Sequence, residues 1–434
     1  MSPQLVGWIG IFVLFAVIAT GIPLGLAMAL VGFAGFAFLT GFPAAFTQLA
    51  TVPYASTASY TLTVLPLFIL MGEFAFHSGL IRGAFESAHK FLGQLRGGLA
   101  MATIVGCAAF AAVCGSGVAT ASTMTSVAYP EMKRFNYKPS LALGSIASGG
   151  TLGVLIPPSN PLVIYALFAE VSIGKLFMAG VVPGVILALL FIGGITIWTM
   201  LDKSAGPSGG KFSLAEKIKS LKNSWPVVVL VVIIMGGLWS GIITATEAAG
   251  IGAFAAFVMG IGMRNLHGKT IISSLDVTVR TTAMIFTILI GAMIFNYFIV
   301  MTGMPAQLAS WVGGLQIPPV GILVVILCVY FILGMIMDTL AMTVLTLPIF
   351  LPIISGLGYD LTWFGIVFIV MCEMAMITPP VGMNIFVIAG MARDVPMYTI
   401  FKGITPFIIS LIVLIGLIII FPQIPMFIPD MMVR

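Results

Sequence analysis

The chain has 434 residues, of which 60% are hydrophobic and only 7% charged, and its formal net charge is +5. Soluble proteins carry about 25% charged residues, so this surface must be covered mostly by lipid rather than water. The small positive charge is spread over short loops and gives no indication of nucleic-acid binding. The cysteines lie in apolar segments without metal-ligand spacing, so we expect neither a metal centre nor a cofactor. They are Cys107, Cys114, Cys328 and Cys372.

Apolar runs of about 20 residues recur along the whole chain, and each can cross a bilayer core of about 30 Å. Only helices or closed barrels satisfy every backbone polar group in lipid, and the runs lack the alternation of barrel strands. The sequence therefore predicts an all-α polytopic membrane protein. Both halves are equally apolar, which favours a single membrane domain.

Loop charge predicts the topology, because Lys and Arg concentrate on the cytoplasmic side of a membrane. Basic residues gather in the segments 82–96, 133–138, 201–223 and 264–280. The segments 41–60 and 303–317 contain none and are expected to be external connections. We therefore place the N-terminus on the periplasmic or external side of the membrane.

The first half reads as three crossing helices followed by an amphipathic surface helix at 82–96. Residues 98–130 are apolar but flanked by basic segments on both sides, which predicts a re-entrant hairpin with its tip near Cys114 to Gly117. A span at 139–171 follows and is broken at Pro157-Pro158. The expected full spans are 4–20, 22–40, 60–79 and 175–200.

The second half repeats this plan. Residues 317–356 have uncharged flanks and predict a second hairpin, and a span at 361–393 is broken at Pro379-Pro380. The segment 264–280 is expected to lie on the membrane surface. The expected full spans are 225–240, 245–263, 281–302 and 403–421.

The two halves match at an offset of 222 residues, which places Ser116 on Asp338 and the first Pro-Pro pair on the second. Loop charge places the first hairpin inside and the second outside, so the repeats are predicted to be inverted. Inverted repeats with broken helices are typical of secondary transporters. We divide the chain into a first repeat at 1–205, a cytoplasmic linker at 206–224 and a second repeat at 225–434.

Each Pro-Pro break predicts an ion site, although a lone break could be a simple kink. Proline lacks the backbone N–H and pushes the preceding residue out of helical angles, which frees carbonyl oxygens for a small cation. The carbonyls concerned belong to Ile156, Pro157, Thr378 and Pro379. The N-terminus of each following half-helix carries a partial positive charge that suits a carboxylate.

The hairpin tips bring further polar groups to this depth. The first tip carries Ser116 and Thr120, and the second carries Asp338 and Thr339. An intramembrane carboxylate is a functional candidate, so we interpret Asp338 as a cation ligand; the alternative is a helix cap, and both can hold. For Glu373, bracing the second break and binding are equally compatible with the sequence.

Several motifs together resemble the large permease subunit of tripartite ATP-independent periplasmic (TRAP) transporters, the DctM-like family, over the whole chain. They include Gly115-Ser116-Gly117-Val118-Ala119-Thr120, Ile156-Pro157-Pro158-Ser159, Thr244-x-Thr246-Glu247 and Ile377-Thr378-Pro379-Pro380-Val381-Gly382-x-Asn384. The family usually has Ser where this chain has Gly117, and often Asn where it has Met371.

The resemblance implies sodium-coupled uptake of an organic acid by an elevator mechanism. It also implies two partners, a small four-helix membrane subunit (DctQ-like) and a periplasmic substrate-binding protein (DctP-like). With the break chemistry, it assigns sodium to Gly115, Ser116, Gly153, Ile156, Pro157, Gly334, Asp338, Thr339, Thr378 and Pro379. It assigns the carboxylate substrate to Gly117, Thr120, Pro158, Ser159, Asn160, Pro380, Gly382 and Asn384.

Three other functions compete with this interpretation. A stand-alone sodium/carboxylate symporter of related inverted-repeat fold would share the breaks and the hairpins. A membrane-embedded enzyme would need paired acids, a metal cluster or a nucleophile motif, none of which the sequence contains. A channel would not need breaks at the midplane.

Overall fold

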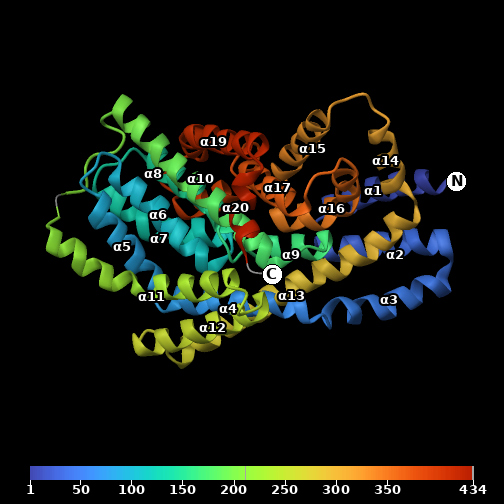
Figure 1. Ribbon diagram of the computed structural model, residues 1–434, viewed down its shortest axis with the longest axis horizontal. Coiled ribbons are helices and arrows are strands. Elements are labelled where there is room, and N and C mark those ends of the chain that lie inside the picture. Colours follow the sequence, from blue (N-terminus) through green and yellow to red (C-terminus); the bar gives the residue numbers. More distant parts are fainter. Residues whose placement is uncertain (211, 433–434) are drawn as a thin grey trace.

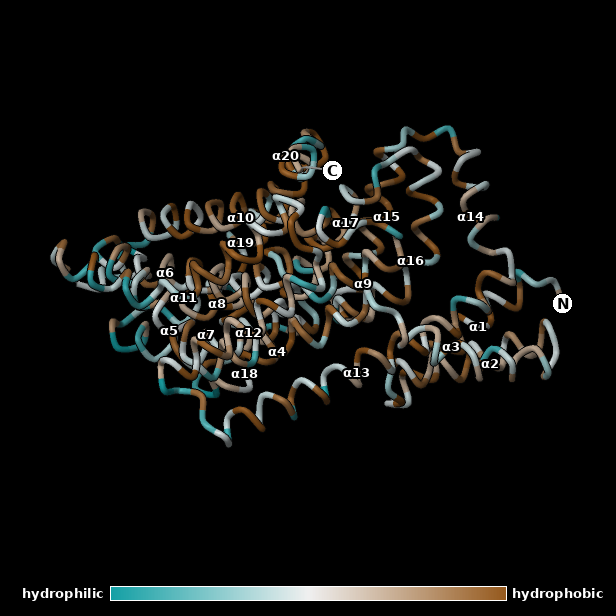
Figure 2. The backbone as a smooth tube through the Cα atoms, turned by 60° about the horizontal axis from the view of Figure 1, so that its bottom comes forward, coloured by the Kyte–Doolittle hydropathy of each residue, from teal (hydrophilic) through white to brown (hydrophobic). Residues whose placement is uncertain are grey.

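The computed structural model describes residues 1–210 and 212–432, and all regular structure in this part of the chain is helical. Seven of these helices are long and apolar enough to cross a membrane, and a bent helix pair adds an eighth candidate span. Hydrophobic residues predominate along the helices (Figure 2). The prediction of an all-α polytopic membrane protein is confirmed.

The N-terminal helices form one side of the molecule together with a long helix from the second half (Figure 1). The long helix, α13 (Gly268–Met301), packs along α2 and against α4. The helix α5 (Leu80–Leu92) follows where a surface helix is expected, and it packs against α6 (Gly98–Cys114) and α11 (Leu214–Trp239). The preceding elements are α1 (Pro3–Ala19), α2 (Leu24–Thr40), α3 (Phe42–Thr57), η1 (Tyr60–Thr63) and α4 (Val64–His77).

Two helices, α6 (Gly98–Cys114) and α7 (Gly117–Arg134), form the first hairpin. The chain reverses there because Gly115 adopts the left-handed region at φ 64°, which costs glycine little, and because Ser116 caps α7. After α8 (Pro139–Leu155), the axis bends by 41° before α9 (Asn160–Ala169) begins. The half ends with α10 (Ile173–Leu201).

The second half contains helices at matching positions. Its second-arm helix α16 begins at residue 339 and α7 at residue 117, and both are 18 residues long. The helices of this half, besides α13, are α11 (Leu214–Trp239), α12 (Ala245–Gly262), α14 (Met304–Gly313), α15 (Pro319–Gly334), α16 (Thr339–Gly356), α17 (Leu361–Met376), α18 (Met383–Met391), α19 (Met397–Ile420) and α20 (Gln423–Met431).

The short half-helix of each half packs against the hairpin of the other half. The first half's α9 packs against α16 of the second hairpin, and the second half's α18 packs against α7 of the first hairpin. A salt bridge of 2.6 Å from Lys133 at the end of α7 to Asp394 after α18 adds to the second contact. Each hairpin is therefore supported by the broken helix of the other half.

Several expected connections are helical instead. The segments 41–60 and 303–317 contain α3 and α14, since an absence of Lys and Arg indicates the side of the membrane but not the backbone conformation. The expected surface segment at 264–280 continues into α13, and an Asp276–Arg280 pair of 2.8 Å spans one turn there. The helix α11 begins at Leu214, inside the expected linker; residues 211, 433 and 434 lie outside the described residues.

Candidate functional site

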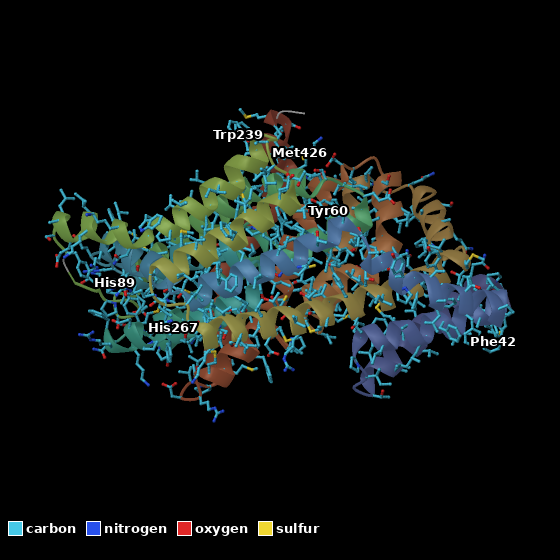
Figure 3. The ribbon with its side chains drawn as sticks, turned by 90° about the horizontal axis from the view of Figure 1, so that it is seen from below. Phe42, Tyr60, His89, Trp239, His267 and Met426 are labelled. Carbon is cyan, nitrogen blue, oxygen red and sulfur yellow. The ribbon has the colours of Figure 1, made fainter. Side chains whose placement is uncertain are left out.

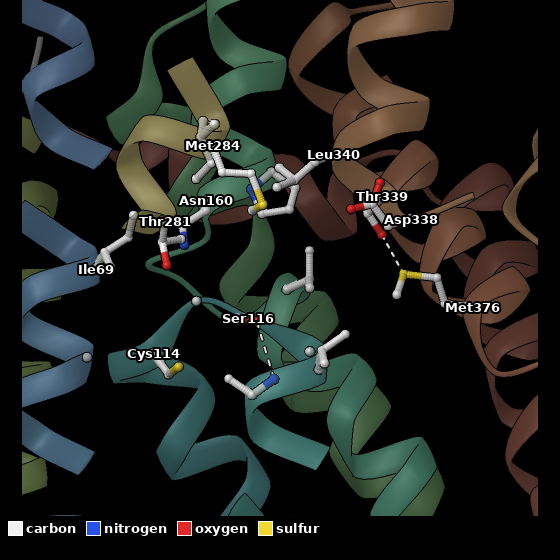
Figure 4. Close-up of a pocket in the computed structure, with 18 of the residues that line it drawn as sticks. Ile69, Cys114, Ser116, Asn160, Thr281, Met284, Asp338, Thr339, Leu340 and Met376 are labelled. Atoms are coloured by element: carbon white, nitrogen blue, oxygen red, sulfur yellow. Dashed lines mark hydrogen bonds between the residues drawn. The ribbon is translucent and has the colours of Figure 1, made fainter. Parts of the chain in front are cut away.

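A cavity of about 360 Å³ lies between the hairpin tips and the helices α4 and α13. Figure 4 shows the first tip at Ser116, the second at Asp338 and Thr339, and Thr281 and Met284 on α13. The cavity volume falls within the usual range for small-molecule sites, which is roughly 300–1,000 Å³. The cavity thus joins both halves of the chain at one place.

Three helix N-termini line this cavity. They belong to α7, through Gly117, to α9, through Asn160, and to α16, through Thr339. Free N–H groups and aligned peptide dipoles give each terminus a partial positive charge. The arrangement suits an anionic group such as a carboxylate, as the break chemistry predicts for α9.

The charged side chains around the cavity are all acidic. The lining includes Glu73 on α4, Asp338 at the second tip and Glu373 on α17, and the described residues of the lining include no Lys, Arg or His. Three carboxyl groups at one intramembrane site favour cations, although one Glu73 oxygen also lies 3.7 Å from His77 Nε2. An anionic group in this cavity would be stabilised mainly by the helix N-termini.

Both hairpin tips use a polar side chain to start their second helix. The Asp338 carboxylate accepts a hydrogen bond of 2.8 Å from the backbone N–H of Ala341, and the Ser116 hydroxyl accepts one of 3.3 Å from Ala119. The capping role considered for Asp338 is confirmed. Asp338 also lines the cavity, so a cation role remains compatible with its position.

The cavity brings together six of the eighteen predicted site residues. They are Gly115, Ser116, Gly117, Asn160, Asp338 and Thr339.

Other predicted residues lie directly behind the first tip. Thr120 donates a hydrogen bond of 2.7 Å to the Ser116 carbonyl, and a Cβ on Gly153 would lie 2.7 Å from the same oxygen. Gly115 is equally close to the first break, since its Cβ would lie 2.6 Å from the Pro158 carbonyl oxygen. Pro158 and Ser159 form this support, whereas Ile156 and Pro157 lie against Gly184 and Gly180 of α10, and none of the four lines the cavity.

The second break is placed differently. Pro379 and Pro380 are exposed, and Thr378 donates a hydrogen bond of 2.7 Å back to the Met374 carbonyl. Gly382 turns at φ 60° beside the ring of Phe401, and neither it nor Gly334 lines the cavity. Asn384 is fully buried but also outside the lining. Both Pro-Pro bonds are cis.

Several lining residues were not predicted from the sequence. Glu73, Cys114, Thr281 and Met284 all face the cavity, and Glu373 was left undecided. Glu73 could have been found from its place in an apolar helix, since an acid at that depth is a functional candidate. Thr281 and Met284 gave no sequence signal, because Thr and Met are ordinary residues of membrane helices.

At the basic end of the molecule, the segment after α10 contacts the N-terminus of α8. Asp202 forms a salt bridge with Lys138, and hydrogen bonds to Lys138 and Ser204 lower the pKa of Asp202 to about 2. Burial beside Phe85 and Phe212 lowers the pKa of His89. Figure 3 shows His89 and His267 at the end of the molecule opposite Phe42.

The amino-acid sequence of this chain matches those of known proteins. Residues 11–424 match the family described as tripartite ATP-independent periplasmic transporter, DctM component. The chain is 34% identical to the C4-dicarboxylate TRAP transporter large permease protein DctM of Pseudomonas aeruginosa, over 89% of this chain and 90% of that protein. It is 29% identical to the sialic acid TRAP transporter large permease protein SiaM of Vibrio cholerae, over 99% of each.

Among solved structures, the YdaH transporter of Alcanivorax borkumensis matches with a TM-score of 0.67. The identity is 15%, and the match covers 88% of this chain and 90% of that one, so the likeness concerns the fold alone. The relatives bear the names of transporter permeases, in agreement with the prediction that the chain is not an enzyme.

Proposed function

Because this chain belongs to the DctM family of TRAP transporters, as its large permease subunit, we propose that it carries out sodium-coupled uptake of an organic acid. The observation that carries this proposal is the cavity itself. Three helix N-termini converge there for an anion, and three carboxyl groups favour cations. One cavity thus offers complementary sites for a carboxylate and for its coupling ions.

The transport step we propose is an elevator movement of the hairpins and broken helices against α4 and α13. On the α4 side the cavity is lined by Glu73, which lies four residues before His77, the last residue of α4, at the end that loop charge assigns to the cytoplasm. This placement supports an inward-facing arrangement. Hairpins that each pack against the broken helix of the other half suit movement as one body.

Native Cys114 tests this orientation because it lines the cavity, whereas Cys107 and Cys372 are buried. In a Cys328→Ala background, a membrane-impermeant maleimide should label Cys114 from the cytoplasmic face of inverted vesicles. Substrate and sodium together should slow the labelling. Labelling of ligand-free protein from the outer face alone would contradict the inward-facing assignment.

We propose that the chain acts in the bacterial inner membrane, with its N-terminus in the periplasm. It would work with a DctQ-like small membrane subunit and receive its substrate from a DctP-like periplasmic binding protein. The names of the relatives include C4-dicarboxylate and sialic acid, so organic acids are the class to test first.

Uptake by proteoliposomes distinguishes this function from a stand-alone symporter. The purified chain is reconstituted alone and with the small subunit, and a panel of labelled organic acids is offered to each preparation with and without the binding protein. An inward sodium gradient should drive uptake only with all three proteins present. Uptake by the chain alone would favour the stand-alone symporter, and uptake indifferent to sodium would refute sodium coupling.

A further inference from the structure

Two buried polar side chains near the cavity have atoms without hydrogen-bond partners among the described residues. Asn384 at the start of α18 is 0% exposed, and neither its amide oxygen nor its amide nitrogen is paired. Glu373 on α17 is 1% exposed. Its Oε1 accepts a hydrogen bond of 2.9 Å from Thr339, but Oε2 has no partner. Buried polar groups are paired in the great majority of cases, so these atoms indicate a missing partner.

Both side chains adjoin the place where α7 and α8 cross at Gly117 and Gly150. A Cβ on Gly117 would lie 3.1 Å from Glu373 Oε2 and 3.1 Å from the Gly150 carbonyl oxygen. A Cβ on Gly150 would lie 3.1 Å from the Gly117 carbonyl oxygen and 3.4 Å from the Asn384 amide nitrogen. The close helix approach therefore places two carbonyl oxygens beside a carboxylate and an amide.

An ionised Glu373 would be uncompensated. Glu373 forms no salt bridge with a described residue, and an unpaired buried ion costs several kcal/mol. All candidate ligands are oxygen atoms once the Asn384 amide, whose two ends are interchangeable in assignment, turns its oxygen inward. Oxygen ligands suit hard cations. Among the described residues, no three His, Cys, Asp or Glu side chains lie close enough together to hold one metal ion, which disfavours a multivalent metal.

We propose that Glu373 and Asn384, with the carbonyl oxygens of Gly117 and Gly150, bind an additional small monovalent cation. The inference rests on the proposed sodium-coupled function and assigns one further cation position, beside the first hairpin tip, whose ligands Gly117 and Glu373 also line the cavity. It also changes the role of Asn384 from substrate ligand to cation ligand. The ligands come from α7 and α8 of the first half and from α17 and α18 of the second half. The bound cation therefore joins the two halves where α18 packs against α7.

Sodium-dependent stability tests this site on the full chain purified with its small subunit. Unfolding midpoints are measured while sodium chloride replaces choline chloride at constant ionic strength. In Glu373→Gln and Asn384→Leu, the sodium concentration for half-maximal stabilisation should rise by about tenfold or more, the scale reached even by outer-shell partners of metal sites. Glu170→Gln, at an exposed carboxylate after α9, is the matched control and should behave as wild type.

Equilibrium binding of radioactive sodium to the same proteins gives a second readout, in which both variants should bind fewer ions per chain than wild type. If folded Glu373→Gln and Asn384→Leu keep the wild-type sodium concentration for half-maximal stabilisation and bind as many sodium ions as wild type, the inference is overturned. The unpaired atoms would then be explained by a buried water or by a protonated Glu373. If Glu373→Gln does not fold, Asn384→Leu decides by the same criteria. Wild type indifferent to sodium in both assays would refute the proposed sodium coupling itself.

Discussion

The support behind the first hairpin tip can be tested by adding a single methyl group at Gly153. In α8 this glycine faces the tip, and a Cβ there would lie 2.5 Å from Thr120 Oγ1 and 2.7 Å from the Ser116 carbonyl oxygen. Carbon and oxygen in close contact are normally separated by roughly 3.3 Å or more. In Gly153→Ala the tip must therefore shift by about half an ångström, because the Ser116 carbonyl belongs to the backbone and cannot rotate away.

The expected loss follows from two opposing effects. Overpacking of a close contact costs about 1–3 kcal/mol. Replacing a helical glycine by alanine recovers about 1 kcal/mol. We expect a net loss of about 0–2 kcal/mol in the free energy of unfolding. Uptake should fall by about tenfold, since binding groups must be held to within about 0.5 Å.

Gly193→Ala is the matched control, because this α10 glycine has nothing within 4 Å of its Cβ position among the described residues. Thermal unfolding in detergent should place the midpoint of Gly193→Ala at or above wild type and that of Gly153→Ala below Gly193→Ala. Sodium-driven uptake in proteoliposomes should be reduced only in Gly153→Ala. Equal midpoints and equal uptake for the two variants would refute the close support of the tip.

Asp338→Asn keeps a good helix cap and should fold, yet its sodium-driven uptake should be nearly abolished. Ser116→Ala should weaken uptake and lower the free energy of unfolding by about 1 kcal/mol, because the cap of α7 is lost. Unchanged sodium dependence in both would remove them from the cation sites. Since the Asp202 pKa is lowered from 3.8 to about 2, its contribution to stability is complete above pH 3.8 and lost as the pH falls towards 2. Asp202→Asn should thus lower the midpoint at pH 7 but match wild type near pH 2, and a constant difference would contradict this. The lowered pKa of His89 makes wild type less stable as the pH falls below 6.5, and thermal scans should show a weaker pH dependence for His89→Phe.

The hairpins could be predicted from the sequence because local signals and global constraints agree there. Glycine and a capping side chain mark each turn, while uniform loop charge on both flanks requires the chain to return to the same side. The second-arm helices α7 and α16 accordingly begin at Gly117 and Thr339, next to the expected tips.

The continuous helix α13 could not be predicted by the same argument. Charged residues such as Asp276 and Arg280 indicate a boundary of the bilayer, but a helix can extend beyond it into water. The cavity posed a similar problem, because its α13 side is formed by unremarkable residues such as Thr281. Which face of α13 meets the hairpin tips depends on packing between segments far apart in the chain.

The two Pro-Pro pairs match in the sequence but do not occupy equivalent environments in the structure. The match at 222 residues predicts equal roles for the two breaks, yet Pro157 and Pro158 are buried whereas Pro379 and Pro380 are exposed. The acidic residues break the symmetry in the same direction. Asp338 stands where the first half has Ser116, so the second tip carries a charge that the first does not.

This asymmetry bears on how an anion and its coupling ions share one cavity. The N-termini of α7 and α9 come from the first half, as does Glu73 on α4, whereas Asp338, Glu373 and the N-terminus of α16 come from the second half. In the function we propose, the helix N-termini would stabilise the substrate carboxylate and the carboxyl groups would stabilise the cations. Opposite charges a few ångströms apart attract by several kcal/mol where solvent is largely excluded. Loading both lowers the cost of carrying either across the bilayer, which is the physical requirement for coupling them.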